Sequence, residues 1–188
     1  LSKTGECIKV PDNLFEKISD TKSPQGIIAL CRIPEHNTRG ISSAGRYVAL
    51  ENISDPSNFG AVARTAEALG ADGLIVSSDG CDPYSPKVLR SSMGTVLRLP
   101  VFVAEDFELL LKSSGLKTYA CVVDSSAESI TVQKFSDGCA VLIGNEANGL
   151  TEKTVMTAYR RVTIPMKGKA ESLNAAAAAA IAVWEMMK

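Results

Sequence analysis

Short apolar runs alternate with helical patterns along most of this chain, and this alternation limits the possible folds more than any other feature. Apolar runs of strand length occupy residues 26–33, 46–51, 73–77, 97–103, 117–123, 139–143 and 161–164. Helical patterns occupy residues 11–20, a segment that ends at Leu69, residues 85–93, 105–114 and 151–159, and the C-terminal segment. Strands that are apolar throughout are typical of a parallel sheet covered on both faces. The sequence therefore predicts an α/β fold, a mostly parallel sheet flanked by helices.

The composition excludes several classes of protein. The five cysteines form no C-x-x-C pair and His36 is the single histidine, so we expect no metal site. Most of the cysteines lie in apolar runs, as expected for free thiols in a reducing, cytoplasmic setting. No apolar run reaches the roughly 18 residues of a membrane span, and no signal-peptide pattern opens the chain, so we expect no membrane partner.

The net charge is −1, from 20 Lys and Arg against 21 Asp and Glu. This is a weak overall indication of a nucleic-acid binder, which usually carries a basic surface. Basic residues do cluster in pairs, and the four pairs are Arg32 with Arg39, Lys87 with Arg90, Arg160 with Arg161, and Lys167 with Lys169. Taken singly, each pair is typical of an ordinary solvated surface.

Three polar, glycine-bearing loops follow apolar strands, at residues 52–60, 144–149 and 165–174. Ligands of open α/β sheets bind beyond the carboxyl ends of the strands, which is where such loops lie. None of the three is a G-x-G-x-x-G or a P-loop sequence, which disfavours a dinucleotide or ATP enzyme. Each loop taken alone is also typical of plain turn chemistry, because Gly, Asn and Pro favour turns whatever the function.

The third loop leads from a strand into the final helix. Pro165 stops strand pairing because it has no N–H to donate, and Gly168 frees the backbone to turn. Ser172 or Asn174 can cap the start of the helix, and residues 175–180, all alanine, then propagate it. The small side chains predict a helix that packs closely against its neighbours.

Together the loops carry a family resemblance. The segments DPSNFGAVARTAEALGADGLI, AVLIGNEANGLTE and VTIPMKGKAESLNAAAAAAIAVWE resemble, in order, the three motifs of the SpoU (TrmH-like) RNA ribose methyltransferases of the SPOUT superfamily. The resemblance covers residues 26–188. It implies a C-terminal trefoil knot, a homodimer, and methyl transfer from S-adenosylmethionine to a ribose 2′-hydroxyl of rRNA or tRNA. It also implies that residues 25–188 are the catalytic domain, and that residues 1–24 are the tail and linker of an N-terminal substrate-binding domain in a longer native chain.

The resemblance assigns roles to individual residues. As catalytic residues it indicates Asn58, Arg64, Glu146, Ser172 and Asn174. As cofactor-binding residues it indicates Val123, Gly144, Ile164, Met166 and Leu173. Backbone groups from the last motif would read the edges of the adenine ring, and the missing side chain of Gly144 would let the cofactor approach the chain. No metal is implied.

The role of Arg64 has two readings. A guanidinium group is hard to deprotonate, so clamping an RNA phosphate and stabilising the attacking 2′-oxygen is the simpler role. A general-base role, as proposed in the family, would require a deprotonated guanidinium.

Two alternatives to the methyltransferase remain at this stage. One is a catalytically silent RNA-binding relative with the same fold, and the intact catalytic residues argue against it. The other is a nucleotide enzyme of flavodoxin-like or Rossmann type, which pattern alone suggests but which lacks a phosphate-binding fingerprint. The alanine run departs from the more branched segment usual in the family, which we expect close helix packing to tolerate.

Overall fold

The computed structural model describes residues 7–35 and 37–188, so residues 1–6 of the expected N-terminal tail and His36 lie outside the described residues. The chain divides into two units between Ile33 and Pro34. The first unit holds the short helix α1 (Asp12–Ile18). The assignment of residues 1–24 to a substrate-binding domain stays a prediction.

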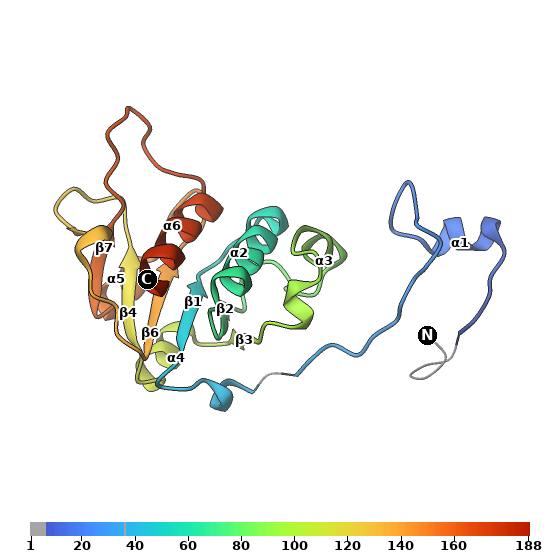
Figure 1. Cartoon of the computed structure of the whole chain (residues 1–188), viewed down its shortest axis with the longest axis horizontal. Helices are drawn as coiled ribbons and strands as arrows, with labels where there is room; N and C mark the ends of the chain where they lie inside the picture. Colours follow the sequence, from blue (N-terminus) through green and yellow to red (C-terminus); the bar gives the residue numbers. More distant parts are fainter. Residues whose placement is uncertain (1–6, 36) are drawn as a thin grey trace. The chain divides into compact units, whose positions relative to one another are not determined.

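The second unit is built on one sheet of seven strands, and every pairing between them is parallel. The strands are β1 (Arg46–Leu50), β2 (Gly73–Ser77), β3 (Val101–Ala104), β4 (Lys117–Cys121), β5 (Glu128–Ser129), β6 (Cys139–Ile143) and β7 (Arg160–Thr163). Their order across the sheet is β3-β2-β1-β6-β4-β7-β5 (Figure 1). The prediction of a mostly parallel sheet flanked by helices is confirmed. This order places the carboxyl ends of β1 and β6 side by side, and those of β4 and β7 side by side.

Helices cover both faces of the sheet, and alternate residues of each strand point to opposite faces. The helices are α2 (Pro56–Leu69), α3 (Pro86–Ser91), α4 (Phe107–Ser113), α5 (Glu152–Thr157) and α6 (Ala175–Met187), with short 3-10 turns at Thr38–Gly40, Thr95–Leu97 and Ile130–Val132. In β1, Val48 and Leu50 join the core beneath α2 and α6, whereas Tyr47 and Ala49 join the core beneath α4. The central strands are thus buried on both faces, which explains their unbroken apolar sequences.

Helix α6 packs against α2 and lies over β1 and β6 (Figure 1). Its buried residues are mostly small, and they are Ala175, Ala179, Ala182, Val183 and Met186. Alanine at these positions lets the helix approach its neighbours closely. The predicted helix is confirmed, and its cap is Asn174 rather than Ser172, because the Asn174 side chain accepts hydrogen bonds from the N–H groups of Ala176 and Ala177.

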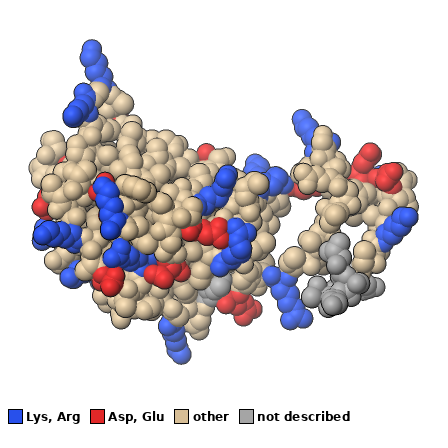
Figure 2. Space-filling view, in the orientation of Figure 1, with Lys and Arg blue, Asp and Glu red and all other residues tan. Residues whose placement is uncertain are grey.

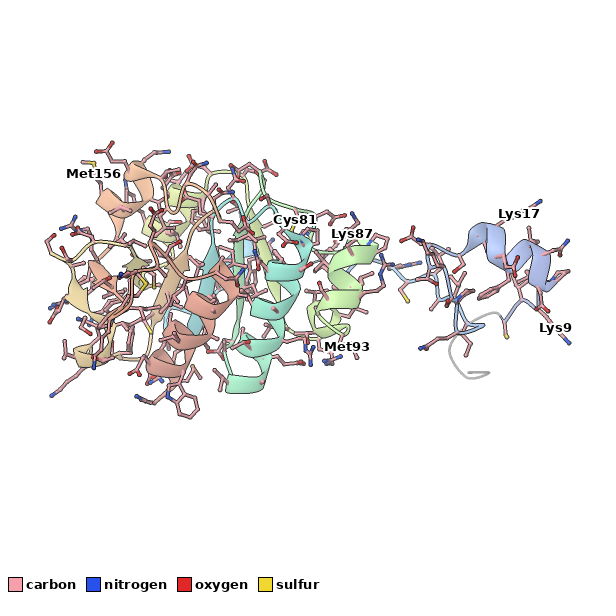
Figure 3. All side chains as sticks on the ribbon, turned by 90° about the horizontal axis from the view of Figure 1, so that it is seen from above. Lys9, Lys17, Cys81, Lys87, Met93 and Met156 are labelled. Carbon is pink, nitrogen blue, oxygen red and sulfur yellow. The ribbon has the colours of Figure 1, made fainter. Side chains whose placement is uncertain are left out.

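Helices α2 and α3 also meet at close range, because Gly60 faces Ser91. A Cβ atom on Gly60 would lie 2.6 Å from the carbonyl carbon of Ser91, which is closer than real Cβ contacts come. The Ser91 hydroxyl donates to the carbonyl oxygen of Pro56 at 2.7 Å. In Figure 3 the two helices lie side by side, with Met93 at the surface just after α3. The contacts of α3 with Pro56 and Gly60 therefore fix the position of the beginning of α2.

One predicted strand is wrong. Residues 26–33 form no strand, and their apolar side chains are exposed, with Leu30 wholly so. The run has the composition of a buried strand, but no described strand pairs with it. An apolar composition favours burial of a segment, but burial also requires a neighbouring element that can cover it.

Other elements begin or end a few residues from their predicted bounds. The strand predicted at residues 97–103 begins only at Val101, because Thr95–Leu97 form a 3-10 turn and Pro100 follows it. The helix predicted at residues 85–93 ends at Ser91, and that at 151–159 ends at Thr157. Within the described residues, no helix has the length and apolar character needed to cross a membrane.

Candidate active site

The carboxylate of Glu146 joins the loop after β6 to the loop after β1. It accepts hydrogen bonds from Ser54 N at 3.3 Å, Ser54 Oγ at 3.1 Å and Asp55 N at 3.2 Å. It also accepts one from Asn58 Nδ2 at 2.9 Å. Because Asp55 caps α2, Glu146 lies at the N-terminus of that helix, where the helix dipole favours a negative charge. The carboxylate therefore holds the first and second motifs together.

Asn58 extends this contact to the third motif. Its Oδ1 accepts a hydrogen bond from Asn174 Nδ2 at 2.9 Å, and the residue is only 8% exposed. Asn174 in turn caps α6 through its own Oδ1. Glu146, Asn58 and Asn174 thus form one chain of hydrogen bonds, which we call the three-motif network.

The network changes the acidity of Glu146. Partial burial raises the pKa of its carboxyl, but the hydrogen bonds from Asn58 and from backbone N–H groups outweigh that effect. The net result is a pKa below the usual value, so the group is fully ionised at neutral pH. An ionised Glu146 acts as an acceptor that fixes loop positions, which agrees with a bracing role.

Two further residues brace the same loops and were missed from the sequence. Glu51, at the end of β1, is 5% exposed and accepts hydrogen bonds from Thr151 N at 2.8 Å, Thr151 Oγ1 at 2.7 Å and Thr154 Oγ1 at 2.6 Å. Asn145 Nδ2 donates to Asn52 O at 2.8 Å. The one sequence feature that could have indicated this role of Glu51 is its position as a charged residue at the end of an apolar run.

Gly144 has a structural role in its own loop, and its expected contact with the cofactor stays a prediction. A Cβ atom there would collide with the backbone of Gly149 and Leu150, at the other end of its own loop. The loop is closed by paired backbone hydrogen bonds between Asn145 and Gly149 at 3.0 and 2.9 Å. The structure therefore requires glycine at position 144 for the loop to close, and Gly144 does not line the cleft described next.

A cleft of about 70 Å³ opens beyond the carboxyl ends of β4 and β7. Four of the five residues predicted to bind the cofactor line it, namely Val123, Ile164, Met166 and Leu173. Cys121, Val122, Thr163 and Ala178 complete the lining, and the first two were within reach of prediction because they precede Val123 in the chain. The lining is largely apolar, and burial raises the pKa of the Cys121 thiol to about 12, so the thiol carries no charge.

The backbone of this cleft has free hydrogen-bonding groups. Ile164, Met166 and Leu173 make no backbone hydrogen bond with other described residues. Because Met166 and Leu173 are exposed, their backbone groups are open to water or to a bound ligand. The loop at residues 165–174, which follows Ile164 and carries Met166 and Leu173, projects beyond the sheet (Figure 1).

Arg64 and Ser172 lie outside both groups of residues. Arg64 is an exposed residue of α2, and its side chain has no ion pair or hydrogen bond to another described residue and no place in the cleft lining. Ser172 is exposed and makes no hydrogen bond with another described residue. Their catalytic roles stay predictions. Among the described residues, no group of three His, Cys, Asp or Glu side chains could hold a metal ion.

Comparison with known proteins identifies the family. A model of the SpoU rRNA methylase family matches residues 45–184. The chain belongs to the SpoU rRNA methylase family. Among its relatives, a 23S rRNA (guanosine(2553)-2′-O)-methyltransferase of Bacillus subtilis (strain 168) is 32% identical over 98% of this chain and 74% of the relative. A 23S rRNA (uridine(2479)-2′-O)-methyltransferase of Streptomyces viridochromogenes is 31% identical over 99% of this chain and 68% of the relative.

Solved structures of similar methyltransferases share the fold. An AdoMet-bound rRNA methyltransferase from Sinorhizobium meliloti matches with a TM-score of 0.86 and 29% identity, over 94% of this chain and 69% of that one. A SpoU methyltransferase of Streptomyces viridochromogenes in complex with AdoMet matches with a TM-score of 0.70 and 32% identity, over 79% of this chain and 61% of that one. The chain therefore has the SPOUT methyltransferase fold. The threading of its C-terminal segment into a trefoil knot stays a prediction.

The lowered pKa of Glu146 predicts how its replacement depends on pH. A carboxyl group whose pKa is lower in the folded state stabilises the fold above its unfolded pKa of about 4.3, and this contribution is lost as the pH falls through the folded pKa. We expect Glu146→Gln to unfold at lower urea concentration than the wild type at pH 7, and the difference to shrink below about pH 4. Urea titrations at several pH values measure this, and a difference independent of pH would contradict the role of the ionised carboxylate.

A pair of variants separates the two roles of Asn174. Asn174→Ala removes the cap of α6 and should lower the free energy of unfolding by about 1 kcal/mol. Asn174→Asp keeps an oxygen to cap the helix but has no N–H to donate to Asn58, so it should stay close to wild-type stability. We expect methyl transfer to fall in both variants. Wild-type methyl transfer by the Asp variant would show that the link to Asn58 is not required.

Proposed function

We propose that this chain transfers a methyl group from S-adenosylmethionine to a ribose 2′-hydroxyl of RNA, with ribosomal RNA as the first substrate class to test. The observation that carries the proposal is the cleft beside β4 and β7, where four predicted cofactor residues meet. The cleft and the three-motif network both lie beyond the carboxyl ends of strands of the same sheet. Relatives named as 23S rRNA 2′-O-methyltransferases support the substrate class.

The residues of the cleft fit the proposed cofactor. Apolar side chains of Val122, Val123 and Leu173 suit the faces of an adenine ring, and the unpaired backbone groups of Ile164 and Met166 suit its polar edges. S-adenosylmethionine, when bound, supplies an electrophilic methyl group on a sulfonium centre. The cleft itself is smaller than the roughly 300 Å³ or more of a typical small-molecule site. Part of the cofactor would therefore extend into the open mouth beneath the loop at residues 165–174.

The remaining site residues position the RNA and the loops. Arg64 has no partner among the described residues, so its guanidinium is free to bind a phosphate and to stabilise negative charge on the attacking oxygen. Lys167 and Lys169, in the loop at residues 165–174, are exposed, and Figure 2 shows positive side chains at the tip of this loop. The three-motif network keeps the start of α2 in a fixed relation to the start of α6, and Arg64 lies further along α2.

The two readings of the function differ in cofactor binding. Calorimetric titration with S-adenosylmethionine should show binding if the chain is a methyltransferase, and none if it is a silent RNA-binding relative. Incubation with ribosomal RNA and, separately, with transfer RNA should then methylate ribose positions in one of the two RNAs.

Arg64→Ala tests the assignment of Arg64. We expect the variant to bind S-adenosylmethionine as the wild type does, because Arg64 does not line the cleft, and to lose about 100-fold or more in methyl transfer. Arg64→Lys is the matched control, because it keeps the charge but cannot bind a phosphate through a planar pair of donors. Near wild-type transfer by a folded Arg64→Ala protein would show the assignment to be wrong.

We also propose a homodimer that acts in the cytoplasm. Helix α6 exposes Trp184, which is 57% accessible, together with the partly exposed Ile181. A large aromatic residue at the surface is a common feature of protein interfaces. The free cysteines of the described chain support the reducing compartment.

Light scattering tests the dimer. The wild type should have a mass of twice 19.9 kDa. Trp184→Glu should shift the mass toward that of a single chain, because it places a charge in an apolar contact. Met156→Glu is the control, since Met156 on α5 is also exposed and apolar but lies at another part of the surface (Figure 3). A monomeric wild type, or equal dissociation by both variants, would contradict the proposed interface.

A further inference from the structure

A second cavity lies at the opposite end of the strands that form the cofactor cleft. Its volume is about 320 Å³, at the lower end of the range for small-molecule sites. Lys117 at the first position of β4, Arg160 at the first position of β7, and Tyr159 just before it contribute to its lining. Glu128, Gln133 and Lys134 close it from the segment around β5. No residue of the three motifs' catalytic set takes part.

The lining carries more positive than negative charge. Its charged residues are Lys117, Lys134 and Arg160 against Glu128 alone. Arg160 is already paired with Glu128 at 2.9 Å. Lys117 and Lys134 have no carboxylate partner among the described residues, so both ammonium groups are available to a ligand.

The other polar groups of the cavity also suit an anion. Tyr159 is half exposed, and its ring centroid lies 5.7 Å from Lys117 Nζ and 5.4 Å from Arg160 Cζ, so the ring holds two cations beside the opening. Gln133 lies near Glu128, and its side-chain amide is the first cause of a lowered pKa of that carboxyl. Its buried Nε2 nevertheless has no partner of good hydrogen-bond geometry among the described residues. A buried N–H without a partner is costly, and an incoming acceptor would satisfy it.

We propose that this cavity binds phosphate groups of the RNA substrate, held by Lys117 and Lys134 with Gln133 as a neutral donor. The inference rests on the proposed function for the nature of the ligand. A chain with a net charge of −1 needs local positive sites to hold a polyanion, and here two lysines without a carboxylate partner among the described residues share one polar cavity. Four residue steps along β4 separate Lys117 from Cys121 in the cofactor cleft, about 13 Å at roughly 3.3 Å per residue. RNA that runs along β4 from its first to its last residue would contact both sites.

The salt dependence of RNA binding tests the proposal. The double variant Lys117→Ala, Lys134→Ala is compared with the wild type for binding to a 23S rRNA transcript at several KCl concentrations. Each phosphate contact contributes about 0.7–0.9 to the slope of log affinity against log salt, so loss of two contacts should reduce the slope by about 1.4–1.8. Binding of S-adenosylmethionine should be unchanged, because neither lysine lines the cofactor cleft.

Lys188→Ala is the matched control. Lys188 is an exposed lysine whose charge is already neutralised by Glu185 at 2.7 Å, so its removal should leave the slope unchanged. An unchanged slope in the folded double variant, or an equal reduction in the control, would overturn the proposal. So would displacement of the RNA from wild type by polyglutamate as effectively as by polyuridylate, since the cavity would then accept any polyanion.

Failure of the proposed function has a separate signature. A wild-type protein that methylates neither ribosomal nor transfer RNA, yet shows the predicted change in slope on mutation, would refute the methyltransferase and leave the phosphate site in place. A methyltransferase whose slope does not change on mutation would do the reverse.

Discussion

The arrangement of this site depends on one carboxylate with four donors. Glu146 reaches across from the loop after β6 and takes up the N–H groups at the start of α2, together with the amide of Asn58. Asp55 is the N-cap of α2, so its N–H is one of the helix-start donors without a partner inside the helix, and the N–H of Ser54 lies one residue before it. One side chain therefore provides hydrogen-bond acceptors for N–H groups at the entry to α2, and the same contacts fix the distance between two loops. Asn58 passes the same constraint to Asn174 and hence to the last helix.

The parallel sheet explains why loops far apart in the sequence can contact one another in this way. Because all strands run in the same direction, every loop that follows a strand emerges at one edge, and residues far apart in the sequence become neighbours there. Asn58 and Asn174 are separated by 116 positions and yet lie within hydrogen-bond distance. The opposite edge, where strands begin, is built from different residues. The two edges can therefore carry separate binding sites, a small apolar cleft at one and a larger, positively charged cavity at the other.

Much of this arrangement could be predicted from the sequence, and the exceptions have physical causes. Continuous apolar runs predicted the buried strands well because both faces of the sheet are covered. The same reasoning was wrong for residues 26–33, where the composition is apolar but the described chain provides no neighbour. Val123, Ile164, Met166 and Leu173, predicted from the family resemblance, line one cleft, whereas Gly144 does not line it and serves the closure of its own loop. Hydrogen bonds such as those of Glu51 depend on distances between segments, which no local pattern encodes.

The loop between β7 and α6 is fixed at both ends but free in between. Thr163 ends a paired strand, and Asn174 is held by α6 and by Asn58, whereas residues 167–172 are exposed. Lengthening a loop with fixed ends costs little, about 0.6 kcal/mol for each doubling of its length. Evolution can therefore insert or delete residues in the middle of this loop, or change their charge, without disturbing the helix beyond it. Related enzymes could acquire new RNA preferences at this place while the machinery on either side stays the same.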